Sequence, residues 1–485
     1  MKAVTTPVSD RSEDSVSNQA PTAGAAGGKV VWLYKKHKKV YPRGVSGVFA
    51  RWRWFFVIAT QLFFYGMPWL QWGGRQAFLL DVASRRFYIF GLVFYPQDVI
   101  YLTGILIISA LSLFLFTAVA GRQWCGYACP QTVYTEIFLW IERKIEGDRS
   151  ARMRLDAGPM TGQKFLRKSA KQVVWLALAL WTGITFVGFF TPIRGVLVDF
   201  VHFSLSPAEA FWIFLYGAMT YGFAGFMREQ VCLYMCPYAR FQSAMFDKDT
   251  LIITYDTQRG EPRGSRSRKA DYKAQGLGDC INCTMCVQVC PTGIDIRDGL
   301  QYECISCAAC VDACDEIMDK VGYPRGLIRY STEHALNEGW DSRAILQHVF
   351  RPRILVYLSI LSLIVIVFIT SLFLRSPFRA DVVRDRATLA RYAEGGKIEN
   401  VYRIQIMNVS ERTQTYTITA DGLPGIEAIV GLSGEIAIGA AKTQWVPVNV
   451  RVPANAGPKG SHTIHFNIIE GDGRQVREKA AFLIP

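Results

Sequence analysis

Eight cysteines fall in two runs that share one spacing, C-x2-C-x2-C-x3-C. The first run reads CINCTMCVQVC and the second reads CISCAACVDAC. Three thiolates at this spacing wrap one face of an iron–sulfur cube, and the fourth lies too far along the chain to close the same cube, so it ligates the other cluster. Zinc sites instead favour C-x2-C pairs joined by longer gaps. The spacing therefore predicts two [4Fe–4S] clusters of the bacterial ferredoxin type.

Each predicted cluster takes three cysteines from one run and the last cysteine of the other. The ligands expected for the first cluster are Cys280, Cys283, Cys286 and Cys314. The ligands expected for the second cluster are Cys304, Cys307, Cys310 and Cys290. Proline follows Cys290, whereas Asp315 follows Cys314, and local charge of this kind tunes the potential of a cluster.

The other four cysteines form two C-x3-C-P motifs, CGYACP at 125–130 and CLYMCP at 232–237. Residues four apart share one face of a helix, so the two thiols of each pair are expected to point the same way. A kink or break is expected at the proline. An arginine precedes each motif, so the two segments form an internal repeat. The thiols expected to converge are Cys125, Cys129, Cys232 and Cys236.

Three interpretations of these four thiols stay open. In the first, they bind a soft cation such as Cu(I), with the thioether of Met235 as a further ligand. In the second, they cycle between dithiol and disulfide. In the third, they are inert buried cysteines that pack as small hydrophobic residues.

Composition indicates a membrane protein, because 50% of the 485 residues are hydrophobic and 13% are aromatic. A bilayer crossing takes about 20 apolar residues. Five stretches meet this length, near 54–72, 99–119, 172–191, 208–227 and 354–374. A juxtamembrane excess of Lys and Arg accounts for the net charge of +14 more simply than binding to nucleic acid, which is not expected.

The distribution of Lys and Arg predicts which side each loop occupies. Residues 1–53, 120–171 and 228–353 carry ten, ten and sixteen, whereas residues 73–96 and 192–207 carry three and one. The N-terminus is therefore expected in the cytoplasm, and five crossings place the C-terminus in the periplasm. All twelve cysteines then fall on the reducing side, which favours metal sites over structural disulfides.

The expected fold class is mixed: a five-helix transmembrane bundle with a cytoplasmic two-cluster ferredoxin domain and a C-terminal immunoglobulin-like β-sandwich. The expected order is a disordered, basic N-terminus (1–50), a membrane domain (51–246), the ferredoxin domain (247–350), the fifth helix (354–374) and the periplasmic sandwich (380–485). Residues 131–146 predict an amphipathic helix, either on the inner membrane surface or packed on the ferredoxin-like region. Residues 87–96 are expected to be interfacial or re-entrant.

Longer motifs resemble the FixG/RdxA family of cytochrome oxidase accessory proteins, also called CcoG. They are QWCGYACPQTVYTE, CLYMCPYARFQSAM, CVQVCPTGIDIRDGLQYECI, CVDACDEIM and GYPRGLIRY. The resemblance runs from about residue 41 to the end. It implies a protein of the bacterial cytoplasmic membrane that supports assembly of cbb-type cytochrome oxidase by reducing Cu(II) to Cu(I) for its copper site. It also implies that the C-x3-C-P cysteines handle copper.

The expected function is therefore cupric reduction, with lipid, copper ions, oxidase subunits or copper chaperones, and an unknown electron donor as partners. The sequence leaves open whether the chain forms a homodimer. One rival is a quinol-linked membrane ferredoxin like those of nitrate and nitrous oxide respiration, which share C-x3-C-P pairs. Another is a non-enzymatic scaffold for oxidase assembly whose clusters are structural.

Overall fold

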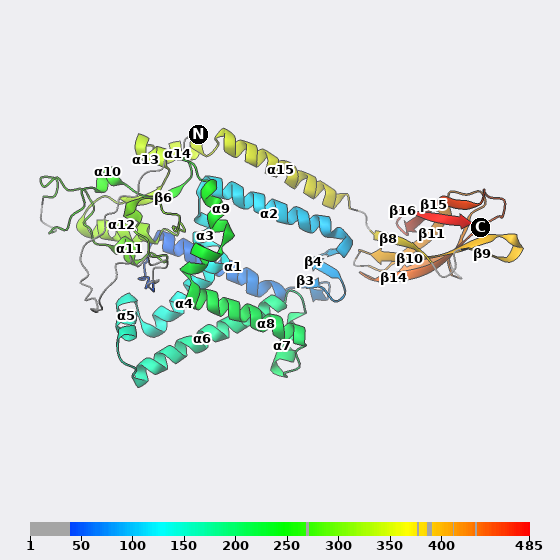
Figure 1. Ribbon diagram of the computed structural model, residues 1–485, viewed down its shortest axis with the longest axis horizontal. Helices are drawn as coiled ribbons and strands as arrows, with labels where there is room; N and C mark the ends of the chain where they lie inside the picture. Colours follow the sequence, from blue (N-terminus) through cyan, green and yellow to red (C-terminus); the bar gives the residue numbers. More distant parts are fainter. Residues whose placement is uncertain (1–38, 268–270, 376–377, 386–389, 411, 432–433) are drawn as a thin grey trace, which may run out of the picture. The chain divides into compact units, whose positions relative to one another are not determined.

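The computed structural model describes residues 39–267, 271–375, 378–385, 390–410, 412–431 and 434–485, and Figure 1 shows their arrangement. Residues Val40 to Pro485 form one compact unit. Most of the predicted disordered N-terminus, up to residue 38, lies outside the described residues.

Four helical segments of the described chain are long and apolar enough to cross a membrane, so the chain is a membrane protein with at least these candidate spans. They are Pro96–Ala120 with α2 (Val99–Ala120), α6 (Gly162–Val187), Pro207–Met227 with α8 (Pro207–Thr220) and the π-helical segment η3 (Tyr221–Met227), and α15 (Pro352–Phe373). Ile100 of α2 and Leu363 of α15 are 71% and 63% exposed, as expected of side chains that contact lipid. The predicted stretch at 172–191 is displaced, because α6 begins at Gly162, after the capping hydroxyl of Thr161.

The first predicted span, 54–72, is a helix with different bounds. Helix α1 (Val48–Gly66) begins six residues earlier and gives way to a short turn, η1 (Met67–Trp69), that contains Pro68. Strand β1 (Gln71–Trp72), paired with β2 (Arg75–Gln76), follows. Arg51 and Arg53 lie in the first two turns of α1. That α1 crosses the membrane stays a prediction.

Helix α4 (Pro130–Glu146) confirms the helix predicted at 131–146 and packs inside the protein. Phe138 and Ile141 contact Trp175 of α6 and Ala224 of η3 in a buried cluster. Trp140 is 44% exposed. The helix packs on α6 and η3, and other residues of the helix, among them Glu136, line a pocket with Cys307 of the ferredoxin-like region. Helix α3 (Gln123–Tyr127) precedes it, and α5 (Arg149–Ala157) follows; α7 (Ile193–Val201) connects α6 to α8.

The two cysteine runs lie between two short strands, β6 (Ile252–Tyr255) and β7 (Ile328–Ser331), which pair antiparallel. Helices α11 (Met285–Gln288) and α12 (Ala309–Val321) each follow a cysteine loop. Ile253, Val311, Met318 and Ile328 form a buried core that contains Cys280, Cys286 and Cys314, and Cys304 and Cys310 pack against it. The short helices α9 (Pro237–Phe241), α10 (Thr257–Gly260), α13 (Glu333–Glu338) and α14 (Ser342–His348) complete this part of the chain.

The C-terminal segment is a β-sandwich, as its alternating sequence predicts. One sheet has the order β12 (Glu427–Ile429), β14 (Thr443–Val452), β10 (Ile398–Asn408), β8 (Phe378–Arg384), with β9 (Arg391–Tyr392) also paired to β10. The other has the order β13 (Glu435–Ile438), β11 (Gln414–Asp421), β15 (Gly460–Glu470), β16 (Gln475–Ile484). Tyr402 and Phe466, one from each sheet, meet edge to face in its core.

Residues 87–96, expected to be interfacial or re-entrant, form part of a small antiparallel sheet. Its strands are β3 (Phe78–Asp81), β4 (Arg86–Ile89) and β5 (Leu92–Phe94). Leu79 and Val93 pack against Met407 of β10, and the hydroxyl of Tyr95 donates to the carbonyl of Asn408 at 3.1 Å. This sheet therefore supports the sandwich.

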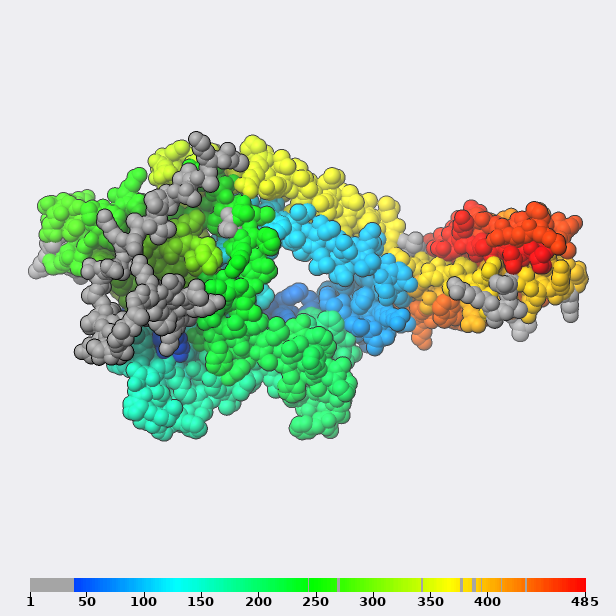
Figure 2. Space-filling model, viewed as in Figure 1, coloured from blue at the N-terminus to red at the C-terminus, as the bar shows by residue number. Residues whose placement is uncertain are grey.

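Helices α2 and α15 run antiparallel (Figure 1), and the space-filling view shows their atoms side by side (Figure 2). At the start of α2, buried Asp98 pairs with Arg375, which follows the end of α15. Near the end of α2, the carbonyl of Ala118 accepts from Arg351, just before α15, at 3.0 Å. The ferredoxin-like region and the sandwich thus attach to opposite ends of this helix pair.

Candidate functional site

The two C-x2-C-x2-C loops have the same backbone shape. In the first loop, Asn282 and Thr284 on either side of Cys283 have positive φ angles of 53° and 58°. In the second, Ser306 and Ala308 on either side of Cys307 have φ angles of 52° and 56°. A left-handed conformation costs a non-glycine residue about 1–2 kcal/mol. Four such residues at equivalent positions indicate loops shaped around a bound group.

The predicted ligands of each cluster line one cavity. The first cavity is lined by Cys280, Cys283, Cys286 and Cys314, with apolar walls that include Met318 and Leu327. The second cavity is lined by Cys290, Cys304, Cys307 and Cys310, with Cys286 at its edge. The fourth cysteine of each run therefore lies with the other run, as the sequence predicts for ligands. Cys283 is the one exposed cysteine of the eight.

This arrangement fits a cubane better than a single ion. Among the described residues, no group of three or more His, Cys, Asp or Glu side chains is placed to hold one metal ion. A [4Fe–4S] cluster instead takes each thiolate on a different iron atom, so its ligands surround a larger space.

Burial keeps these thiols protonated while no metal is bound. Desolvation raises the pKa of Cys286, Cys304 and Cys314 to about 12 each. The pKa of Cys310 rises well above its ordinary value for the same reason. Cluster binding therefore must displace protons, which makes metal loading depend on pH.

In both C-x3-C-P motifs the proline starts a new helix. Pro130 is the first residue of α4 and Pro237 is the first residue of α9, positions where the missing N–H costs nothing. Cys129 and Cys236 are the extended residues that precede these helices. The break at proline is confirmed, but the expectation that both thiols of a pair lie on one helix is wrong, because the first cysteine lies inside a helical segment and the second is an extended residue after it.

The two motifs share a further backbone feature. The N–H of Cys129 donates to the carbonyl of Trp124 at 3.0 Å, and the N–H of Cys236 donates to that of Val231 at 2.8 Å. In each case the acceptor is the residue before the first cysteine. The first cysteine lies in α3 in one motif and in the π-helical segment η4 (Val231–Met235) in the other.

Two side chains that flank the first motif bind backbone carbonyls that flank the second. Arg122, before the first motif, donates to the carbonyl of Ala239, just after the second, at 2.7 Å. Gln131, just after the first motif, donates to the carbonyl of Arg228, before the second, at 3.1 Å. These crossed contacts hold the repeats together as a pair.

The four thiols lie near enough to affect one another electrostatically. Burial raises the pKa of Cys125 to about 12, and the negative potentials of Cys129, Cys232 and Cys236 add to the shift. Burial likewise raises the pKa of Cys232 to about 11, with contributions from Cys129 and Cys236. We call these four residues the thiol group.

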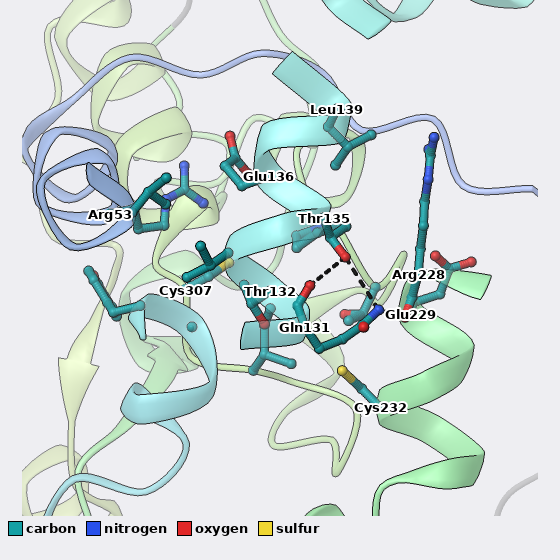
Figure 3. A pocket seen from close by; sticks show the side chains of 17 residues that line it. Arg53, Gln131, Thr132, Thr135, Glu136, Leu139, Arg228, Glu229, Cys232 and Cys307 are labelled. Carbon is teal, nitrogen blue, oxygen red and sulfur yellow. Dashed lines mark hydrogen bonds between the residues drawn. The ribbon is translucent and has the colours of Figure 1, made fainter. Parts of the chain in front are cut away.

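The thiol group lies beside the second cavity. A Cβ atom added to Gly126 would lie 2.7 Å from the carbonyl oxygen of Ile305 and 2.8 Å from the Cα of Cys307, so only glycine fits. Cys125 packs against the buried cluster that contains Ile305 and Cys307. A pocket lies between the two sites and is lined by both Cys232 and Cys307 (Figure 3).

Asp312 of α12 fastens the cysteine loops to α1. Its carboxylate accepts the backbone N–H groups of Phe49 at 3.2 Å and Ala50 at 2.7 Å, which are free donors at the start of this helix. A Cβ at Gly47 would overlap the Asp312 side chain. Sequence reasoning missed this contact, because the capping residue lies more than 260 positions away.

A buried charge network supports the second motif. Glu142 of α4 pairs with Arg152 at 3.1 Å, Lys171 at 3.5 Å and Arg228 at 2.9 Å. Burial opposes ionisation, but Arg228, followed by Lys171 and Arg152, holds the pKa of Glu142 below its usual value. Arg228 was noted in the sequence as the residue before the second motif, whereas nothing local pointed to Glu142.

Comparison with known proteins agrees with this architecture. Models of a 4Fe–4S dicluster domain, a 4Fe–4S binding domain and the Ig-like fold at the C-terminus of FixG match residues 227–333, 102–147 and 368–485. Nitrogen fixation protein FixG of Rhizobium meliloti is 37% identical over 91% of this chain and 91% of its own length. Proteins RdxB and RdxA of Cereibacter sphaeroides are 42% and 39% identical over 80% and 88% of this chain, and 83% and 92% of their own lengths.

The fold and the site thus define a class of protein: a membrane protein with two ferredoxin-like cysteine loops and a C-terminal β-sandwich. The chain belongs to the FixG/RdxA family. Its iron–sulfur domains support an oxidoreductase role.

Proposed function

We propose that this protein reduces Cu(II) to Cu(I) at the thiol group. Cys280, Cys283, Cys286 and Cys314 would hold one [4Fe–4S] cluster, and Cys304, Cys307, Cys310 and Cys290 the other. When bound, the clusters would supply single electrons at low potential. Each Cu(II) gains one electron and becomes Cu(I), the copper ion that soft thiolates bind best.

The observation that carries this proposal is the contact of Gly126 with the Ile305–Cys307 loop. It supports the proposal because the first pair of thiols then lies directly against the loop that carries Cys307. Inert buried cysteines would need neither the paired motifs nor this close approach. The thiol group is not placed to hold one ion with three ligands. Since a pair of thiolates suffices for Cu(I), each copper ion would bind two cysteines of the thiol group at a time.

The proposed setting is the bacterial cytoplasmic membrane, with the cysteines in the cytoplasm and the sandwich in the periplasm. The ferredoxin-like region and the sandwich attach to opposite ends of α2 and α15. This supports their placement on opposite sides of the membrane. The family resemblance adds the purpose, which is copper supply for cbb-type oxidase assembly. Oxidase subunits or copper chaperones would receive the Cu(I).

The test is Cu(I) formation by purified, iron-loaded protein reduced with dithionite and freed of excess reductant. A Cu(I)-specific chelator reports the product. Because thiols themselves reduce Cu(II), a Cys304→Ser variant with the thiol group intact is the control. We expect most Cu(I) formation to be lost in that control and in the variant with Cys125, Cys129, Cys232 and Cys236 changed to serine. Equal Cu(I) formation in all three proteins would refute the proposal.

One observation favours a second candidate function. The 4Fe–4S binding domain model covers residues 102–147, whose only cysteines are Cys125 and Cys129. The thiol group would then hold iron–sulfur, and the protein would be an electron conduit like the quinol-linked membrane ferredoxins. Two clusters give about eight iron atoms per chain and three give about twelve, so iron analysis after anaerobic purification distinguishes the candidates.

A further inference from the structure

Arg53 places a buried positive charge in the pocket between the thiol group and the second cavity. Its side chain extends from α1 and is 8% exposed. Figure 3 shows it beside Cys307, with Glu136 and Thr132 also lining the pocket. Within the described part of the chain, its guanidinium makes no ion pair, and its buried Nε has no hydrogen-bond partner.

The acidic groups around Arg53 are engaged elsewhere. Glu136 pairs with Arg143 at 3.2 Å, and Asp312 accepts the N–H groups at the start of α1. The thiol of Cys307 lines the same pocket and lies beside Arg53 (Figure 3). Guanidinium stays charged in proteins, and burying a charge without a partner is costly. A negative charge at Cys307 would therefore stabilise the buried guanidinium of Arg53.

A [4Fe–4S] cluster on four thiolates supplies that negative charge, and reduction increases it. A nearby cation stabilises the reduced form more than the oxidised form and so raises the reduction potential. Arg53, which lies beside the second cavity in the pocket that Cys307 also lines, would act in this way.

The first cavity also contains an arginine, but that charge is neutralised. Arg297 donates to both carboxylate oxygens of Asp295, from Nε at 2.8 Å and from Nη2 at 2.5 Å. The two cavities thus differ in the net charge beside their cysteines.

We propose that Arg53 raises the reduction potential of the cluster held by Cys290, Cys304, Cys307 and Cys310 above that of the other cluster. Reducing equivalents then collect next to the thiol group rather than at the exposed Cys283. This inference deepens the proposed function, since it assumes loaded clusters that serve the thiols. Its test involves no copper, so the two proposals can fail separately.

The experiment is a redox titration of the purified full-length protein, followed by electron paramagnetic resonance. Loss of one signal in Cys304→Ser identifies the second cluster. We expect Arg53→Met to lower the midpoint potential of that cluster and to leave the other unchanged. Arg53→Lys should retain most of the native potential. Arg51→Met removes an exposed arginine two residues away on the same helix and should move neither midpoint.

Glu136→Gln provides a second measurement, because it removes negative charge from the same pocket and should raise the midpoint of the second cluster. If Arg53→Met does not retain iron, the midpoint measured in Glu136→Gln tests the proposal in its place. Unchanged midpoints in every variant that retains iron, or equal shifts of both clusters, would overturn the proposal.

Discussion

The backbone of Gly126 lies against the backbone of Cys307, with no room for a methyl group between them. This contact joins the first C-x3-C-P motif to the ligand loop of the second cavity. It also gives a reason for a difference between the repeats, since CGYACP has glycine where CLYMCP has Leu233.

Gly126→Ala should uncouple the two sites. The added Cβ meets backbone atoms of Ile305 and Cys307, so α3 or the cysteine loop has to shift. We expect a loss of about 1–3 kcal/mol in stability. Displacement of reacting groups should slow Cu(I) formation by roughly tenfold to a hundredfold. The rate is measured on protein whose iron content has been determined.

Gly222→Ala is the matched control, because an added Cβ there meets nothing within 4 Å. It should leave both rate and iron content unchanged. If Gly126→Ala behaves like this control, the contact has no part in the reaction.

Asp312→Ala should loosen the attachment of the cysteine loops to α1. Loss of the cap should cost about 1–2 kcal/mol and accelerate hydrogen exchange at the amides of Phe49 and Ala50. Hydrogen exchange with mass spectrometry measures this directly. Asp319→Ala on the same helix removes an exposed partner of Arg325 and should not change exchange at those amides. Native protection in Asp312→Ala would show that the cap is dispensable.

Glu142→Gln should destabilise the protein strongly, because it leaves three cations without their shared carboxylate. Breaking a buried ion pair costs about 3–5 kcal/mol. Thermal unfolding in detergent reports the loss. Glu316→Gln breaks only an exposed pair with Lys320 and should change stability by less than about 1 kcal/mol. Similar melting temperatures for the two variants would contradict this role of Glu142.

The contribution of Glu142 should depend on pH in one direction. Its pKa is lower in the folded protein than in the unfolded chain, where a Glu titrates near about 4.3. The stabilisation is therefore complete above that value and is lost as the pH falls through the folded pKa. The difference in melting temperature between native protein and Glu142→Gln should be constant from about pH 6 to pH 8 and shrink below about pH 4. If this difference in melting temperature grew as the pH fell, it would exclude a lowered pKa of Glu142 in the folded protein.

The sequence predicted features that depend on local spacing. Cysteines at x2 spacing form a loop whatever surrounds them, so Cys280 to Cys286 and Cys304 to Cys310 lie as expected. Alternation of apolar and polar residues likewise predicted the strands of the sandwich, such as β10 and β14. The ligand assignment itself stays a prediction, because the structure places these thiols without showing what they bind.

Features that depend on distant residues were not predictable. Arg228 and Glu142 pair across 86 positions, and no local pattern relates them. Helical periodicity put Cys125 and Cys129 on one face, but the first helix ends at Tyr127 and Pro130 begins the next one, which leaves Cys129 in an extended conformation between them. The preference of proline for the first turn of a helix was the available signal. Strands β3 to β5 gain their stability from contact with Met407, more than 300 residues further along the chain.

The most direct measurement mixes dithionite-reduced, iron-loaded protein with one equivalent of Cu(II) and follows both metals by rapid-freeze electron paramagnetic resonance. In the native protein the Cu(II) signal should disappear and the reduced-cluster signal should fall by one electron equivalent, both at one rate. Both should persist in the variant with serine at positions 125, 129, 232 and 236. Loss of the Cu(II) signal in that variant at the native rate would contradict reduction at the thiol group.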